Sequence, residues 1–320
     1  MRALAVPVLL TVPQGTVAVH HTPRAAVSDS LGSVVLVHGI SSNHRFWDLA
    51  PGRSLVNHLS ERGFDVWNVD LAGHAPEAHG SHGPSSIDDH GRFDLPAVLA
   101  HVRAQSDGPI HYVGHSMGGM VLAVALATTD LERELASAVV VGSPLDFADM
   151  DEVFEGALRL RRLGRIVPSP AAARLMAVTQ RNTLWTIDRL LYNPDNLTGG
   201  SEALMLRRVV SPLGKAEVAQ FALAQPDGAF RSADGTVTYR DVLGHVRLPM
   251  LFIAGRADCL VPPDRVKVYY DSVGSADKRF LVAGVANGMH ADYGHLDLGV
   301  GDTVAVDVYP PIVDWLSGVR

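Results

Sequence analysis

The sequence predicts an α/β protein in which helices cover both faces of a doubly wound, mostly parallel sheet. Short runs rich in β-branched residues recur along the chain, and segments of helical length separate them. Runs that are apolar on both faces are typical of buried parallel strands. The chain has 320 residues, of which 47% are hydrophobic and 19% charged, so it is long enough to bury a large core. Alternating strands and helices then favour a layered sheet.

The chain is expected to open with a β-hairpin. Strands are predicted at residues 4–11 and 16–21, joined by the turn Pro13, Gln14 and Gly15. The apolar start resembles a secretory signal only superficially, because a proline interrupts it and no small-residue cleavage site follows. We therefore expect the first residues to belong to the folded domain.

The remaining elements follow in alternation. Strands are predicted at residues 34–37, 65–69, 110–113, 138–141, 250–254 and 279–283. Helices are predicted at residues 54–62, 92–105, 117–128, 263–272 and 311–317. This order of short strands and longer helices is the pattern of βαβ units.

The alternation stops between residues 143 and 248. There the sequence consists of amphipathic helical pieces broken by prolines and by a pair of glycines. We expect the first part of the core at residues 1–145, a helical insertion at 146–247 and the second part of the core at 248–320.

Composition excludes several classes of partner. The formal net charge is -7, and no Lys/Arg-rich run is present, so we expect no nucleic-acid partner. No apolar run reaches the ~18 residues that a membrane span requires. The single cysteine, Cys259, cannot form an internal disulfide or a thiolate metal cluster, and we expect it to be a small buried hydrophobe. A cytoplasmic protein is the expectation.

The strongest chemical signal is the run from Gly114 to Gly118, which contains His115, Ser116 and Met117. It follows a predicted strand directly and opens a predicted helix, which is the context of a G-x-S-x-G nucleophile elbow. Glycines two residues before and after the serine are needed because a Cβ atom there would collide with neighbouring backbone. The turn exposes the serine Oγ, and the helix N-terminus favours a developing oxyanion.

A nucleophilic serine needs a base and an orienting acid. Asp258 lies in the loop after the strand predicted at residues 250–254, and His295 lies after the last predicted strand. His290, in a longer loop, is a second candidate for the base. We favour His295 because it opens the final helical region, and the order Ser, Asp, His agrees with the motif.

These motifs resemble those of α/β-hydrolase-fold serine hydrolases, and nearly all of the chain outside the insertion takes part. The similarity is closest to the branch of acid lipases and polyhydroxyalkanoate synthases. It rests on residues 53–67, 70–74, 293–297 and 309–311, whereas residues 34–40 resemble the strand and oxyanion loop of the family as a whole. The synthases of that branch use cysteine as nucleophile, and this chain has Ser116, so the resemblance favours hydrolysis over polymer synthesis.

The resemblance implies a carboxylic ester hydrolase, lipase-like or esterase-like, that works through an acyl-enzyme. Ser116 would be the nucleophile, His295 the base and Asp258 the acid that orients it. The backbone N–H groups of Ile40 and Met117 would form the oxyanion hole. We expect a small-molecule or lipid-like ester with an apolar acyl group as substrate, and neither a metal nor an organic cofactor.

The resemblance also implies that the insertion covers the active site as a cap, because this fold accepts lids after the strand predicted at residues 138–141. Candidate residues of the substrate pocket are His38, Phe46, Trp47, His115 and Trp185. The same triad would also serve an acyltransferase, a thioesterase or a hydrolase of C–C bonds, and these alternatives stay open. A scaffold without turnover is disfavoured because all three triad residues are present.

Several histidines and carboxylates gather in one loop-rich region. They are His74, His79, His82, His90, Asp88, Asp89 and Asp94. Only His79 and His82 have helical spacing, and glycines and a proline make their stretch a loop. We expect these histidines to be exposed or to belong to active-site loops, without a metal.

Overall fold

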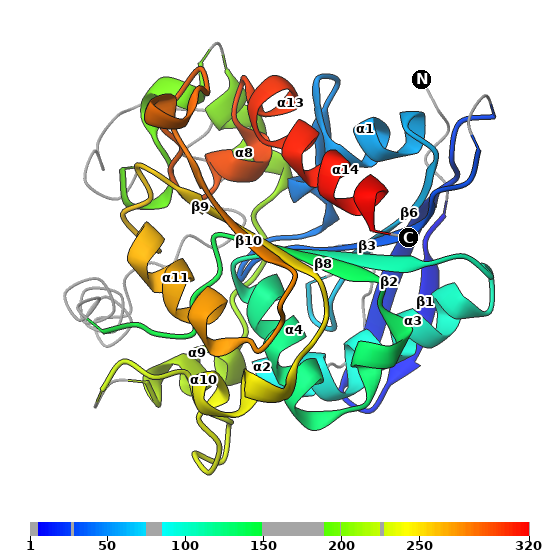
Figure 1. Cartoon of the computed structure of the whole chain (residues 1–320), viewed down its shortest axis with the longest axis vertical. Helices are drawn as coiled ribbons and strands as arrows, with labels where there is room; N and C mark the ends of the chain where they lie inside the picture. The colour runs from blue at the N-terminus through cyan, green and yellow to red at the C-terminus, as the bar shows by residue number, and fades with distance from the viewer. Residues whose placement is uncertain are drawn as a thin grey trace.

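The computed structural model describes residues 6–26, 29–74, 85–148, 189–198, 200–224 and 227–319. Its centre is an eight-stranded sheet in the order β1-β2-β6-β3-β7-β8-β9-β10 (Figure 1). The strands are β1 (Val8–Val12), β2 (Gly15–Thr22), β3 (Gly32–Val37), β6 (Phe64–Asp70), β7 (Ile110–His115), β8 (Ser137–Val141), β9 (Met250–Gly255) and β10 (Lys278–Ala283). β4 (Asp48–Ala50) and β5 (Arg53–Ser54) form a separate antiparallel pair.

The sheet confirms the predicted fold class. All pairs from β6 across to β10 are parallel, whereas β1 pairs with β2 and β2 with β6 in antiparallel fashion. Every residue of β3, β7, β8 and β9 is buried, as expected for strands covered on both faces. The predicted opening hairpin is present as β1 and β2, with residues 4 and 5 outside the described part of the chain.

Helices cover both faces and make two apolar cores. The longer helices are α1 (Leu55–Glu61), α3 (Leu95–Arg103), α4 (Met117–Thr128), α11 (Pro263–Ser272) and α14 (Tyr309–Gly318). Side chains of α3, α4 and α11 belong to one core, and those of α1 and α14 to the other. Figure 1 shows the two groups on opposite sides of the sheet. The predicted helices are therefore confirmed. The ends of α4 and α11 are as predicted, and those of the other three are shifted.

The helix predicted at residues 92–105 differs most from the expectation. The chain enters through α2 (Ile87–Asp89), continues as the π-helical turn η2 (His90–Asp94) and only then becomes α3. Gly91 permits the close packing of this turn against α4, because a Cβ atom there would lie 2.5 Å from Val124 Cβ. The wider turn also aligns His90 with Asp94, whose side chains are hydrogen-bonded.

The chain leaves the sheet after β8 and returns to it at β9, which is the next strand in space. Between these two points lie α8 (Ser201–Arg208), α9 (Lys215–Ala222) and α10 (Tyr239–Val242). In Figure 1, α8 lies on the side of α13 (Val304–Asp307) and α14, and α9 lies on the side of α4. The intervening segment therefore contacts both helical layers.

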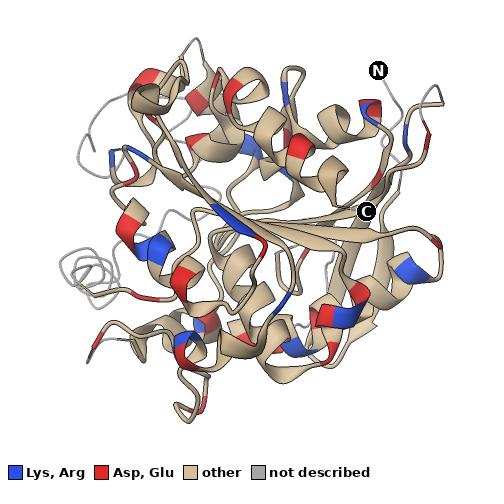
Figure 2. Cartoon of the chain, in the orientation of Figure 1, with Lys and Arg blue, Asp and Glu red and all other residues tan. Residues whose placement is uncertain are grey.

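Charged side chains are mixed on the surface. In the view of Figure 2, Lys and Arg positions are scattered among Asp and Glu positions. This mixed pattern agrees with the near balance of 27 basic and 34 acidic residues. Among the described residues, no helix is long and apolar enough to cross a membrane.

Cys259 is exposed, so the expectation of a buried hydrophobe was wrong. The physical reason lies in the preceding residue. The Asp258 carboxylate turns inward and accepts hydrogen bonds from the backbone N–H groups of Leu260 and Val261. This tight turn faces the next side chain toward solvent.

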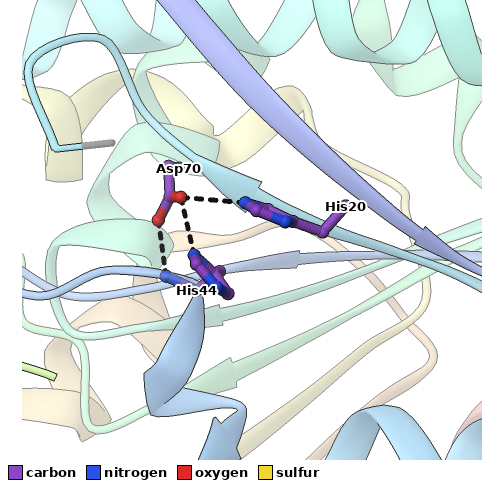
Figure 3. Close-up of side chains that lie close together, drawn as sticks. All are labelled: His20, His44 and Asp70. Carbon is purple, nitrogen blue, oxygen red and sulfur yellow. Dashed lines mark hydrogen bonds and ion pairs between the residues drawn. The ribbon is translucent and has the colours of Figure 1, made fainter. Parts of the chain in front are cut away.

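Asp70, at the end of β6, connects three segments (Figure 3). Its Oδ2 lies 2.7 Å from His44 Nδ1 and 3.1 Å from His20 Nε2, and its Oδ1 accepts the His44 backbone N–H at 2.5 Å. Burial raises the pKa of Asp70, but the hydrogen bonds from the two histidines outweigh burial and hold it well below its usual range. The carboxylate thus ties β2 and η1 (His44–Phe46) to the sheet.

We expect the substitution Asp70→Asn to lower the free energy of unfolding by about 1–3 kcal/mol at pH 7, because one of the donors around it loses its acceptor. Urea denaturation of both proteins measures this loss. Asp65→Asn is the matched control on the same strand. Asp65 pairs with the half-exposed Arg24 and with His21, and an exposed pair contributes at most about 1 kcal/mol.

The cost of Asp70→Asn should depend on pH. The pKa of Asp70 is lower in the folded chain than its ordinary value of about 3.9, so its contribution is complete above about pH 5 and is lost as the pH falls. We expect the difference between parent and variant to narrow between about pH 5 and about pH 3. A difference that stays constant over this range would contradict the assignment.

Candidate active site

Ser116 occupies the sharp turn between β7 and α4. Its backbone has φ 52° and ψ −116°, a conformation that L-residues rarely adopt and that costs on the order of 1–3 kcal/mol. Its N–H donates to the Val141 carbonyl at the end of β8, at 2.8 Å. The residue is 8% exposed. The predicted strand-turn-helix context of the serine is therefore present.

The two glycines of the motif stand where any side chain would collide with backbone. A Cβ atom on Gly114 would lie 2.7 Å from the Gly118 carbonyl carbon. A Cβ atom on Gly118 would lie 2.7 Å from the Val37 carbonyl oxygen. This agrees with the reason given for the glycines from the sequence, and it packs the serine turn directly against the end of β3.

Asp258 and His295 form a buried pair. His295 Nδ1 lies 2.8 Å from Asp258 Oδ2, and the other carboxylate oxygen accepts two backbone N–H groups at 2.9 and 2.7 Å. The two side chains are at most 3% exposed. The loops after β9 and β10 thus meet, and the carboxylate fixes the orientation of the imidazole ring.

His295 also lies against the end of β8. A Cβ atom on Gly142 would be 3.5 Å from two atoms of the His295 ring. Gly142 follows Val141, whose carbonyl binds Ser116 N–H. The structure therefore gathers Ser116, Asp258 and His295 at the carboxyl ends of neighbouring strands.

The second histidine candidate has a different environment. The His290 side chain is 68% exposed, and its Nδ1 lies 2.7 Å from Asp307 Oδ1. Burial raises the pKa of Asp307, but hydrogen bonds from His290 and Tyr293 outweigh burial and lower it. His290 thus pairs with a carboxylate of its own, outside the Asp258 pair.

The loop after β3 runs beside the serine. A Cβ atom on Gly39 would lie 3.1 Å from Ser116 Cβ and 3.0 Å from His115 Nδ1, so Ile40 follows directly at this side of the turn. Ser41 comes next, with φ 54°. Its hydroxyl donates to the Ser211 carbonyl at 2.6 Å, and its own carbonyl accepts the Ser211 N–H at 2.9 Å. Residues following α8 thus hold this loop.

Four of the five predicted pocket residues lie within the described chain, and all four are buried. The Phe46 ring stacks on the His115 ring at 4.3 Å, and the Trp47 indole N–H donates to the Val37 carbonyl at 3.1 Å.

Burial lowers the pKa of His38 to about 3 and that of His115 well below its usual value, so both rings are neutral. Trp185 lies outside the described residues.

His115 contacts His295, the candidate base, directly. Its Nε2 lies 3.0 Å from the His295 carbonyl oxygen, and the two rings are 4.7 Å apart. The neutral ring therefore donates its single N–H to that carbonyl. This bond holds the backbone of His295 from the side of the serine turn.

Sequence reasoning missed a second support of the His295 loop. Asp297 accepts hydrogen bonds from the backbone N–H groups of Gly294 and Asn193 and from the Asn196 side chain, at 2.6–3.0 Å. Leu296 N–H donates to the Leu191 carbonyl. The local signal was the asparagine-rich turn at Pro194, but nothing in the sequence indicated its partner about 100 residues later.

The structure also regroups the loop histidines. His74 and His90 meet Glu217 of α9, and their ligand-type atoms lie within 4.8 Å of one another. His79 and His82 lie outside the described residues. Sequence reasoning missed Glu217, because no local pattern relates it to histidines more than 100 positions earlier.

The profile of the alpha/beta hydrolase family matches residues 34–298 of the chain. A pimeloyl-[acyl-carrier protein] methyl ester esterase of Neisseria meningitidis is 28% identical over 246 residues, which is 75% of this chain and 80% of that protein. Lipase 3 of Drosophila melanogaster is 29% identical over 117 residues, covering 33% of this chain and 30% of that protein.

Solved structures agree in fold. A thermophilic esterase from Thermogutta terrifontis superposes with a TM-score of 0.66 at 21% identity, covering 98% of this chain and 99% of that one. A monoglyceride lipase from Saccharomyces cerevisiae gives a TM-score of 0.63 at 15% identity, covering 99% and 96%. The family match spans most of the sequence, and the sheet has the corresponding architecture. The chain belongs to the alpha/beta hydrolase family.

Proposed function

We propose that the chain is a serine hydrolase that cleaves carboxylic esters with apolar acyl groups through an acyl-enzyme. The observation that carries the proposal is the buried Asp258–His295 pair beside the strained turn of Ser116. A serine, a histidine and a carboxylate at the same edge of the sheet, after β7, β10 and β9, are what nucleophilic acyl transfer requires.

In the proposed mechanism, Ser116 Oγ attacks the ester carbonyl while His295 Nε2 takes its proton. Asp258 keeps the proton on His295 Nδ1 and stabilises the imidazolium that forms. His295 then protonates the leaving alcohol. Water, deprotonated by the same ring, attacks the acyl-enzyme and releases the acid.

The developing oxyanion would be held by the backbone N–H groups of Ile40 and Met117. Met117 begins α4, so its N–H is one of the unpaired donors at a helix N-terminus. Gly39 lies against Ser116 Cβ, and this contact supports Ile40 as the second donor. Two fixed donors of this kind stabilise a tetrahedral intermediate without reorganisation.

The relatives support an ester as the substrate. One is named for a methyl ester on a carrier-bound acyl chain, and others are named as lipases. Cleavage of an apolar acyl ester is common to both kinds of activity. We therefore propose a substrate whose acyl group is apolar and whose alcohol group is small or lipid-like.

The insertion at residues 146–247 is proposed to cap the site. In support, Arg208 and Ser211 bind the loop after β3, through Asn43 and Ser41, and Asn193 and Asn196 bind the loop of His295. We propose that Phe46, backed by Trp47, forms one wall of the acyl pocket with His38 and His115. Trp185 would contribute from the insertion.

We expect the substitution Ser116→Ala to lower the turnover of p-nitrophenyl esters by on the order of 10⁴ or more, because the triad acts as a unit. The series runs from acetyl to palmitoyl, and its optimum distinguishes a short-chain esterase from a lipase. Ser272→Ala on α11 is the control and should retain parental activity.

Two results would contradict ester hydrolysis. If esters are not cleaved but a fluorophosphonate probe labels Ser116, the triad serves an acyltransferase, a thioesterase acting on other substrates or a C–C bond hydrolase. If the probe does not label Ser116 either, the serine is not activated and the chain is not a serine hydrolase.

The two histidines give a separate test. We expect His295→Ala to lower kcat by at least about 10³-fold, because the base is lost. His290→Ala should leave kcat within about twofold, because the ring is exposed and pairs with Asp307. Steady-state kinetics on one ester measures both variants. The reverse ranking would make His290 the base.

A further inference from the structure

Three buried side chains converge from separate parts of the chain. His74 follows β6, His90 begins the π turn η2 and Glu217 lies in the first turn of α9. Glu217 Oε1 lies 2.7 Å from His74 Nε2 and 3.0 Å from His90 Nε2. The three side chains are at most 2% exposed. Two imidazole nitrogens and a carboxylate oxygen thus face one another in a site shielded from solvent.

A second hydrogen bond orients the side chain that carries each of these ligand-type atoms. His74 Nδ1 lies 3.0 Å from the Ser42 carbonyl oxygen, and His90 Nδ1 lies 2.7 Å from Asp94 Oδ2. The other Glu217 oxygen accepts the Gly214 N–H at 3.1 Å. Histidines that bind metals almost always donate their second N–H to a carboxylate or a carbonyl in this way.

Without a metal, the hydrogen bonds of the cluster require an N–H group at every ring nitrogen. Each ring has an acceptor at both nitrogens, so both histidines must carry two protons to satisfy Glu217 and the outer partners. Within the described chain, no lysine or arginine pairs with Glu217 or Asp94. One divalent cation would replace both inner protons and leave the total charge unchanged.

The surroundings of the cluster favour a cation. The Glu217 and Asp94 carboxyl groups lie on the two sides of the His90 ring, and both side chains are at most 1% exposed. Buried carboxylates need a positive partner, because an unpaired buried charge is costly.

We propose that His74 Nε2, His90 Nε2 and Glu217 Oε1 bind a divalent transition-metal ion, with Zn²⁺ as the best match. Two histidines and a glutamate are an established ligand set for zinc. At metal–ligand distances of about 2.0–2.1 Å, tetrahedral ligand atoms lie about 3.3 Å apart, so the two contacts of Glu217 Oε1, at 2.7 and 3.0 Å, would lengthen by a few tenths of an ångström to admit the ion. Water would complete the coordination.

The ion would have a structural role. Its ligands come from the core loop after β6, from η2 and from α9 of the insertion, so binding would clamp the insertion onto the core. His74 also holds Ser42 of the loop that runs beside Ser116. A substrate cannot reach ligands that are at most 2% exposed, which separates this site from ester cleavage.

The cluster of Asp70, His20 and His44 in Figure 3 offers a useful contrast. Its ligand-type atoms also lie within 4.8 Å of one another. Its two rings, however, stack with centroids 3.7 Å apart, and within the described chain no acceptor fixes the second nitrogen of either ring. This cluster is an ion-pair network rather than a metal site.

A zinc ion at this cluster differs from the expectation, drawn from the sequence, that no metal is bound. The sequence offered only His79 and His82 at helical spacing, and neither belongs to the proposed site. Glu217 was the missing ligand, supplied by the insertion.

The test measures metal content of the full-length protein. After incubation with Zn²⁺ and removal of the excess, we expect about one equivalent by elemental analysis. Titration with a competing chromophoric chelator then gives the affinity. We expect at least about 100-fold weaker binding for Glu217→Gln and His90→Gln, and about 10–100-fold weaker binding for Asp94→Asn, which removes only an outer contact. His20→Gln, in the contrasting cluster, should bind Zn²⁺ like the parent.

A measurement on the parent alone guards against variants that fail to fold. Co²⁺ in place of Zn²⁺ should give the visible absorption bands of a four-coordinate site with nitrogen and oxygen ligands. Absence of both Zn²⁺ and Co²⁺ binding at micromolar concentration would overturn the proposal and leave a protonated cluster. Equal Zn²⁺ affinity in the parent and in folded Glu217→Gln would also overturn it, because the ion would then lie elsewhere.

Discussion

The close approach of three backbone segments at Ser116 is the constraint on which the rest of the candidate site depends. Gly118 lies against the last carbonyl of β3, Gly114 lies against Gly118, and Ser116 N–H binds the last carbonyl of β8. The turn is strained, and it persists because neighbouring strands on both sides of β7 hold it. This turn also determines the positions of the loop after β3 and of His295, because both pack against residues that contact it.

The sequence predicted the sheet well because its central strands are buried on both faces. Continuous runs of Val, Ile and Leu leave little ambiguity about such strands, and the glycines of the serine turn have a steric reason that can be stated without coordinates. The ends of the helices and strands were harder to predict. The π turn at residues 90–94 depends on the contact of Gly91 with α4, which no local pattern reveals.

Long-range polar contacts account for what sequence reasoning did not find. Glu217 meets His74 across 143 positions, and Asn196 meets Asp297 across 101. Such pairs are determined by how the insertion packs on the core, and residue type alone does not encode them. Cys259 is a smaller case of the same limit, because its exposure follows from the inward turn of the Asp258 side chain.

The chain leaves and re-enters the sheet at adjacent strands, β8 and β9. The two strands are parallel, so the segment leaves at the carboxyl end of β8 and must cross to the opposite edge of the sheet, where β9 begins. Such a segment is a single long crossover connection between neighbouring strands. Its length and sequence can diverge, or be exchanged for those of another family member, without altering the register of any strand pair. Where the segment caps the site, as proposed, substrate preference can therefore change independently of the stability of the sheet, as long as the segment keeps its contacts with the core.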